Sequence, residues 1–280
     1  HGRTLGALSL NQSKQVQKRW YPQVPKVLTM PYPKANDLRN WFIIGRDGIV
    51  RSYLSNMINQ KFGLIDPDEI AYVIIEPVQG EGGYVVPDKE EFKHIFELCH
   101  ENNIPIICDE VQAGLGRTGK WWCCEHFNVK PDVIASAKAL QIGATISKRG
   151  MFPSESGRIS STWGEGNAIA SACGYKIIEI IEKKNLLRNA AKQGERMKKA
   201  MQDVMAKQKK IVDVRGIGLM LAFELDSVAT RKKVLDNCLK NGLLLAPCGY
   251  KTVRVLPPLD VTDREVDLFA KIIEKSAKKI

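Results

Sequence analysis

The sequence predicts an α/β protein, in which a mainly parallel β-sheet flanked by helices is followed by a smaller C-terminal α+β domain. Three short, continuously apolar runs predict buried strands, at residues 71–75, 104–108 and 132–136. A helical pattern at 89–102 separates the first two runs. Continuous apolar strands that alternate with helices are typical of a parallel sheet covered on both faces. In such sheets ligands bind beyond the carboxyl ends of the strands.

Local signals in the N-terminal half support this order of elements. Asp88 is placed to cap the helix at 89–102, with Glu91 three residues later. The opening residues HGRTLGALSL carry no start signal and indicate the interior of a domain. Residues 20–53 contain four prolines, so we expect a long irregular connecting segment there.

In the C-terminal half, the hydrophobic pattern first predicts long helices and then a mixture of strands and helices. Residues 166–207 predict two long helices, and further helices are expected at 229–241 and at 263–278, the last opening on a capping box of Thr262 and Glu265. Four strand-like segments accompany the later helices, at 211–215, 219–225, 243–247 and 252–256. We therefore expect an incomplete large domain over 1–165, connecting helices over 166–208 and a small α+β domain over 209–280.

Composition and charge narrow the class of function. The chain has 280 residues, 44% hydrophobic and 26% charged, and no apolar run approaches the ~20 residues of a membrane span. No signal-peptide pattern opens the sequence, so the expected location is the cytoplasm. The net charge is +11, but the lysines fall in scattered pairs on predicted helix faces without interleaved aromatic residues. This pattern argues against nucleic-acid binding.

The seven cysteines form no C-x-x-C pair, so the sequence supports neither a zinc ribbon nor a dithiol redox motif. Cys123, Cys124 and His126 are poorly spaced for one tetrahedral metal site, and no second pair of ligands follows them. We therefore expect reduced thiols and no bound metal.

Three residues carry candidate chemistry. Lys138 follows an apolar strand among small residues, which favours a lowered pKa and a free nucleophilic amine, although a surface lysine is the alternative. Asp109 ends the strand at 104–108, where it would pair with a protonated pyridine nitrogen, cap a helix or join a structural ion pair. Arg254 lies in an apolar strand, where it would grip a substrate carboxylate or form an internal salt bridge.

The segment GLGRTGK at 114–120 fits the spacing of a nucleotide-binding phosphate loop. However, Trp121 stands where Ser or Thr should hold magnesium, and no strand directly precedes the loop. The sequence therefore argues against a nucleotide hydrolase.

Five separated motifs resemble the class III aminotransferases, the family of ornithine, acetylornithine and 4-aminobutyrate aminotransferases. They are EPVQGEGGY (76–84), ICDEVQAGLGRTGKWWCCEHFNVKPDVIASAKAL (107–140), STWGEG (161–166), DVRGIGLMLAFEL (213–225) and RVLPPLDVT (254–262). The resemblance covers nearly the whole chain and implies a fold-type I transferase that depends on pyridoxal 5'-phosphate.

The resemblance also implies roles for individual residues. Lys138 would hold the cofactor through a Schiff base and move protons, and Asp109 would pair with the pyridine nitrogen. Glu76 and Arg254 would bind the substrate, and Arg254 would hold the carboxylate of the substrate. The remaining cofactor contacts would come from Val111 on the ring face, Gln112 near the phenolic oxygen, and Ser161 and Thr162, of which Thr162 would bind the phosphate in the neighbouring subunit's site.

The implied reaction moves an amino group to a keto acid such as 2-oxoglutarate. The expected donor is an ω-amino acid such as 4-aminobutyrate, ornithine or acetylornithine, and the expected assembly is a homodimer with shared active sites. Two alternatives stay open: an amino-acid racemase that uses the same cofactor, and an inactive fragment or binding module.

Some features depart from the family pattern. Family members have a long segment before HGRT that carries the glycine-rich loop for the cofactor phosphate. We therefore expect an N-terminally truncated chain that binds pyridoxal phosphate weakly on its own. In addition, QIGATISK (141–148) stands where many members have a glycine-rich stretch, and Trp163 and Glu165 replace more common residues. The identity of the amino donor is therefore not transferred from the family.

Overall fold

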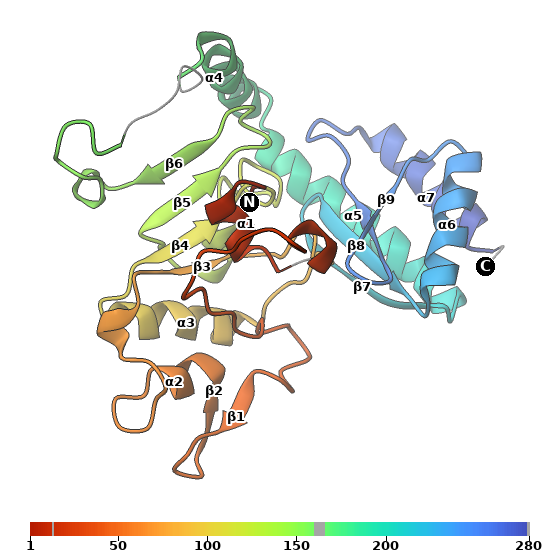
Figure 1. The fold of residues 1–280 in the computed structure, drawn as a ribbon. Helices are drawn as coiled ribbons and strands as arrows, with labels where there is room; N and C mark the ends of the chain where they lie inside the picture. The colour runs from red at the N-terminus through yellow and green to blue at the C-terminus, as the bar shows by residue number, and fades with distance from the viewer. Residues whose placement is uncertain (13, 160–165, 279–280) are drawn as a thin grey trace.

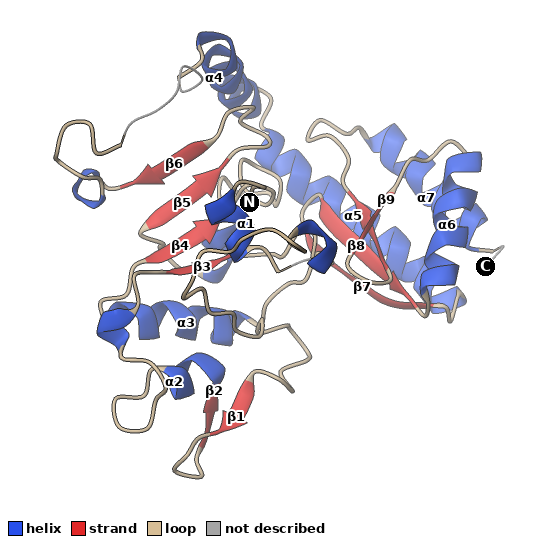
Figure 2. Ribbon diagram, in the orientation of Figure 1, coloured by secondary structure: helices blue, strands red, loops and turns tan. Residues whose placement is uncertain are grey.

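The computed structural model describes the chain except for residue 13, residues 160–165 and residues 279–280. Its elements form two units, each consisting of a four-stranded sheet with helices packed against it. Figure 1 shows the first unit in red to green and the second in blue, and Figure 2 shows the sheet and helices of each. The proposed domain limits at 165 and 208 stay predictions.

The first sheet has the strand order β3-β4-β5-β6. Its strands are β3 (Val73–Ile75), β4 (Ile106–Asp109), β5 (Val133–Ser136) and β6 (Ala144–Ser147). The first three run parallel, as predicted, and β6 pairs antiparallel with β5 at the edge. Strand β6 was not predicted because its four residues are partly exposed and form no continuous apolar run.

Helix α3 (Lys89–Glu101) packs beside this sheet (Figure 2). The Asp88 carboxylate accepts hydrogen bonds from the backbone N–H groups of Glu90 and Glu91, so the predicted cap is confirmed. Burying each large apolar side chain of the helix stabilises the fold by roughly 1.5–3 kcal/mol relative to exposing it. The buried face consists of Phe92, Ile95, Phe96 and Cys99.

The chain before β3 holds short elements and two antiparallel strands. They are α1 (Leu5–Leu10), η1 (Gln15–Gln17), β1 (Phe42–Ile44), β2 (Val50–Ser52), α2 (Tyr53–Met57) and η2 (Pro67–Glu69). The prediction of an irregular segment over 20–53 was therefore wrong at its C-terminal end, where β1 and β2 pair. Gly48, with a φ of 78°, supplies the left-handed position in their turn. Strands of three partly exposed residues leave too weak a pattern to predict.

The second sheet is antiparallel throughout, in the order β7-β8-β10-β9. Its strands are β7 (Ile211–Ile217), β8 (Met220–Leu225), β9 (Ala246–Cys248) and β10 (Thr252–Val255). The strand predicted at 243–247 begins only at Ala246, because the Leu243 N–H instead closes the preceding helix by donating to the Cys238 carbonyl at 2.9 Å.

Long helices flank the second sheet and connect it to the first. They are α4 (Ala168–Lys183), α5 (Leu186–Lys207), α6 (Val228–Lys240) and α7 (Asp263–Ala277). The last three contribute to the second hydrophobic core, and the capping box of Thr262 and Glu265 at α7 is confirmed. None of the described helices combines the length and hydropathy of a membrane span.

The GLGRTGK segment forms successive turns, followed by the short helix η3 (Cys123–Phe127). The Arg117 carbonyl accepts a hydrogen bond from the Leu219 N–H at 3.0 Å, and Gly119 lies against Ala191 of α5. The segment is thus packed against the second unit and does not link a strand directly to a helix, as a phosphate loop would. Its structure agrees with the exclusion of a nucleotide hydrolase.

Helix α5 approaches the turn between β7 and β8 through glycines. A Cβ atom at Gly194 would lie 2.2 Å from the Gly218 carbonyl oxygen, and a Cβ atom at Gly218 would lie 2.5 Å from the backbone carbon of Thr118. Three segments of backbone therefore stack without room for a side chain, which fixes the second unit against the GLGRTGK turns.

Replacing Gly194 with alanine should therefore lower the free energy of unfolding by about 1–3 kcal/mol, the usual cost of overpacking. Urea denaturation measures the change. The control is Gly6→Ala in α1, where the new methyl group meets no heavy atom within 4 Å. This control should leave stability unchanged or raise it by up to ~1 kcal/mol, since alanine favours helix. Equal effects of the two substitutions would contradict the close approach.

Candidate active site

The candidate site lies beyond the carboxyl ends of the parallel strands β3, β4 and β5. Glu76 directly follows β3, Asp109 is the last residue of β4, and Lys138 lies two residues after β5. Asp109 is in register with Ala135 of the neighbouring strand. The hydrophobic pattern placed Asp109 and Lys138 at strand ends, and the strand pairing brings these ends to one edge of the sheet.

Asp109 is a buried carboxylate that lies beside His1. Both of its carboxylate oxygens lie 2.8 Å from His1 Nδ1. The Val111 N–H donates to Oδ1 at 3.1 Å. These contacts offset the cost of burying the charge. Sequence reasoning missed His1, whose only signal was that it opens the HGRT segment.

Lys138 combines an exposed side chain with a lowered pKa. Partial desolvation by the surrounding chain lowers the pKa from 10.5, while the negative charges of Asp109 and Glu76 oppose this effect. The charge of Arg254 lowers the pKa further. The amine thus lies within electrostatic range of all three predicted polar site residues, and it remains accessible for reaction.

Glu76 is the most strongly perturbed carboxyl group of the site. Burial raises its pKa from 4.5 to about 7, and the charge of Asp109 adds to the effect. Its Oε2 atom accepts a hydrogen bond from the Gly80 N–H at 2.8 Å, which partly opposes the shift. Glu76 therefore changes its charge near neutral pH, beside the amine of Lys138.

Gln112 follows Val111 in the turn after β4 and presents a polar atom without a partner. Among the described residues, no hydrogen bond reaches its buried Oε1 atom. The atom lies so close to the turn after β3 that a Cβ at Gly80 would be 2.2 Å away. One end of the amide is thus available to a group that the chain itself does not supply.

Arg254 comes from β10 of the second sheet and forms the internal salt bridge that the sequence left as an alternative. Its Nη1 atom donates to Glu81 Oε1 at 2.7 Å. The turn that carries Glu81 is fixed to the second unit, since the Gly249 N–H donates to the Glu81 carbonyl at 2.8 Å and Arg215 Nη2 donates to the Gly83 carbonyl at 2.7 Å. Sequence reasoning missed Glu81, although it is the second glutamate of the 76–84 motif.

Two predicted cofactor residues, Ser161 and Thr162, lie outside the described residues, and their roles stay predictions. Val111 lies in the turn after β4, next to Asp109. The structure therefore brings Glu76, Asp109, Lys138 and Gln112 to one edge of the first sheet, and the Glu81 turn links Arg254 to them.

Behind Asp109, Glu110 forms a buried cluster with Cys108 and Cys124. The Glu110 oxygens accept hydrogen bonds from the backbone N–H groups of Cys123 and Cys124, at 3.0 and 2.8 Å. Burial raises the pKa of Glu110 to about 6, and a hydrogen bond with Cys124, followed by burial, raises the pKa of the Cys108 thiol. Glu110 thus anchors η3 to the end of β4, and the raised pKa of Cys108 favours its protonated thiol over a metal-binding thiolate.

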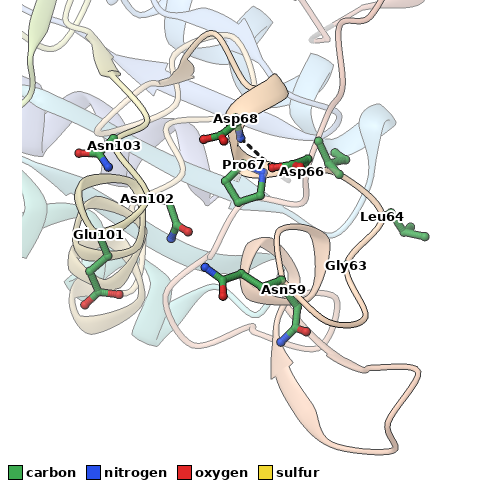
Figure 3. Close-up of a pocket in the computed structure, with 11 residues that line it drawn as sticks. Asn59, Gly63, Leu64, Asp66, Pro67, Asp68, Glu101, Asn102 and Asn103 are labelled. Carbon is green, nitrogen blue, oxygen red and sulfur yellow. Dashed lines mark hydrogen bonds between the residues drawn. The ribbon is translucent and has the colours of Figure 1, made fainter.

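One pocket of the described chain lies away from this chemistry. Figure 3 shows a pocket of about 560 Å³ between the residues after α2 and the C-terminal end of α3, lined by Asn59, Asp66, Asp68, Glu101 and Asn103 among others. The C-terminal end of α3 leads into the start of β4, so the pocket lies at the opposite edge of the sheet from Asp109. This pocket is therefore separate from the candidate site.

The Glu76 pKa predicts a pH dependence of stability. A carboxyl group whose pKa is raised by folding binds a proton that the unfolded chain has released, so its contribution to the free energy of unfolding falls as pH rises from about 4.5 to about 7. Glu76→Gln should flatten this part of a stability curve measured by urea denaturation at several pH values. A curve unchanged by Glu76→Gln would show that the group titrates normally.

Comparison with known proteins shows which family this chain resembles. The family model for class-III aminotransferases matches residues 1–276. The chain is 35% identical to an acetylornithine aminotransferase of Prochlorococcus marinus, over 100% of this chain and 64% of the relative. It is also 36% identical to an alanine/serine racemase of Pyrococcus horikoshii, over 99% of this chain and 62% of the relative.

A solved structure agrees with these matches. The ornithine aminotransferase of Toxoplasma gondii superposes with a TM-score of 0.85 at 28% sequence identity, over 100% of this chain and 62% of that chain. The chain thus spans less than two thirds of the length of the curated relatives named above. Since the family model covers all but the last four residues, the chain belongs to the class-III aminotransferases.

Proposed function

We propose that this chain forms part of a pyridoxal 5'-phosphate-dependent aminotransferase, which moves an amino group from an amino acid to a keto acid such as 2-oxoglutarate. The observation that carries the proposal is the meeting of Lys138 and Asp109 beyond neighbouring parallel strands. The first is an amine with a lowered pKa, and the second is a buried carboxylate whose two oxygens lie 2.8 Å from the Nδ1 ring nitrogen of His1. This pair matches what the cofactor needs at its aldehyde and at its ring nitrogen.

The described residues fit pyridoxal phosphate. Asp109 would hold the protonated ring nitrogen, Val111 would pack against the ring, and the unpartnered end of the Gln112 amide would meet a polar ring atom. Lys138 would hold the cofactor covalently through its amine. When bound, the cofactor supplies an electron sink that makes the Cα–H bond of an amino acid acidic. Ser161 would contribute to cofactor binding, and Thr162 would bind the phosphate in the neighbouring subunit's site.

Lys138 would also move the proton at Cα of the substrate. Because desolvation lowers its pKa, a larger fraction of the side chain is free amine at neutral pH than in an isolated lysine. A single base near one face of the substrate can remove the proton and deliver it to the adjacent carbon. Glu76, which changes charge near pH 7, would adjust the charge beside this amine and contact the substrate.

Arg254 would bind a substrate carboxylate in place of Glu81. The guanidinium matches a carboxylate through two parallel hydrogen bonds, and Glu81 now occupies this position. A site whose arginine is covered by its own glutamate can accept either an ω-amino group or an α-carboxylate at the same place. The names of the acetylornithine and ornithine aminotransferase relatives support ω-amino donors, among which we include 4-aminobutyrate.

We also propose a homodimer with shared active sites. Helix α4 supports it, because Ile169 and Tyr175 are 77% and 74% exposed on a helix with few buried residues. Large exposed apolar side chains on one helix favour a protein partner. The cytoplasmic location stays a prediction from the sequence.

The match to an alanine/serine racemase favours racemisation as the second candidate. The two functions separate in one experiment with the chain and added pyridoxal phosphate. An aminotransferase forms glutamate from 2-oxoglutarate and a donor such as ornithine, and it needs the keto acid. A racemase instead removes the optical rotation of alanine or serine without a keto acid, and that result would overturn our proposal.

Lys138→Ala should lower the rate of glutamate formation at least about 100-fold, the scale of losing a general base. A coupled glutamate assay measures this rate. The control is Lys130→Ala, an exposed lysine before the start of β5, which should leave the rate unchanged. Equal activity of the two variants would show that Lys138 does not take part in the reaction.

Arg254→Met should raise the KM for 2-oxoglutarate about 10- to 100-fold, the size of a lost charge-assisted hydrogen bond. The kcat should change less, since the contact forms in the ground state as well as in the transition state. Steady-state kinetics separates the two constants. Arg264→Met, on the exposed face of α7, is the matched control. A KM equal to that of the control would contradict carboxylate binding by Arg254.

A further inference from the structure

The Glu81 carboxylate binds two cations at once. Its Oε1 atom accepts from Arg254 Nη1 at 2.7 Å, and its Oε2 atom accepts from Lys14 Nζ at 3.0 Å. The Lys14, Glu81 and Arg254 side chains are 45%, 33% and 23% exposed, so this row of charges runs from solvent inward to the site. Burial alone would raise the pKa of Glu81, but the two cations outweigh it and lower the pKa.

This pairing matters when a substrate carboxylate reaches Arg254. The proposed function requires Glu81 to give up Arg254, which would leave an ionised carboxylate in a partly desolvated place without its cation. Lys14 is bound to the other oxygen and can remain there during the exchange. Two carboxylates would then face two cations, and the local charge would stay balanced.

The same contacts indicate whether loss of the Lys14 charge strengthens or weakens binding of a substrate carboxylate. While Glu81 is shared, its negative charge is divided between Lys14 and Arg254, which also repel each other. After the exchange, each cation has a carboxylate of its own. Loss of the Lys14 charge therefore removes a partner from Glu81 mainly in the substrate-bound state, and it should weaken binding of the carboxylate.

We propose that Lys14 is a positioning residue, which holds Glu81 after a substrate carboxylate displaces it from Arg254 and so raises the affinity of the site for carboxylate substrates. This role rests on the proposed function of Arg254. It adds a residue from the N-terminal segment, which is far from the strand ends in sequence, to the determinants of substrate binding.

Isothermal titration calorimetry with glutarate tests this role without turnover, because glutarate has two carboxylates and no keto group to react. Lys14→Met removes the charge and keeps an unbranched side chain. It should weaken glutarate binding about two- to fivefold, the scale of one partly exposed ion pair. The matched control is Lys18→Met on the same segment, where the ammonium donates to Gln12 Oε1 at 2.8 Å. This control should leave the Kd unchanged.

A double-mutant cycle then tests whether Lys14 acts through Glu81. In a Glu81→Gln background, Lys14→Met should have no effect on the Kd for glutarate. Equal weakening in both backgrounds would mean general electrostatic attraction and would overturn the positioning role. An unchanged Kd for Lys14→Met alone would overturn it as well.

Arg254→Met in the same titration distinguishes failure of the proposed carboxylate site from failure of the proposed role of Lys14. If it does not weaken glutarate binding, the proposed carboxylate site fails, and the role of Lys14 falls with it. If Arg254→Met weakens binding and Lys14→Met does not, only the role of Lys14 fails. Urea midpoints equal to that of the unsubstituted chain show that each variant is folded.

Discussion

The site depends on three neighbouring parallel strands that end together. Parallel pairing places the carboxyl ends of β3, β4 and β5 at one edge, so residues that are far apart in sequence share one space there. Two carboxylates and one amine meet at this edge, where desolvation makes their charges interdependent. Removing Asp109 or Lys138 would therefore alter the protonation of Glu76 as well as remove a contact.

The second sheet contributes Arg254 to the candidate site through one turn that contacts both units. Residues 80–84 follow β3, and their backbone carbonyls accept hydrogen bonds from the β9–β10 hairpin and from Arg215. Arg215 also pairs with Asp213 and Glu224, so two carboxylates hold the guanidinium that fixes the turn. Arg254 thus contacts the turn that follows β3, and this contact positions the guanidinium for the proposed carboxylate binding.

The sequence was sufficient for the fold-type I α/β class and for part of the site. The strands β3, β4 and β5 coincide with continuous apolar runs in the sequence, so the positions of Asp109 and Lys138 at or just after strand ends follow from a local pattern. No such local pattern predicts contacts between side chains of segments that are far apart in sequence. His1 and Asp109 are 108 positions apart, and Glu81 and Arg254 are 173 apart. Strand β6 and the β1–β2 hairpin were missed because partly exposed short strands leave little hydrophobic signal.

The most direct test of the central claim locates the covalent bond to the cofactor. The chain is incubated with pyridoxal phosphate and reduced with borohydride, which makes an amine-linked cofactor permanent. Peptide mass spectrometry then identifies the modified lysine. The account predicts modification at Lys138 in preference to exposed lysines such as Lys130, and loss of this modification in Asp109→Asn. Modification of Lys138 at the level of Lys130, in the presence or absence of the Asp109 carboxylate, would contradict it.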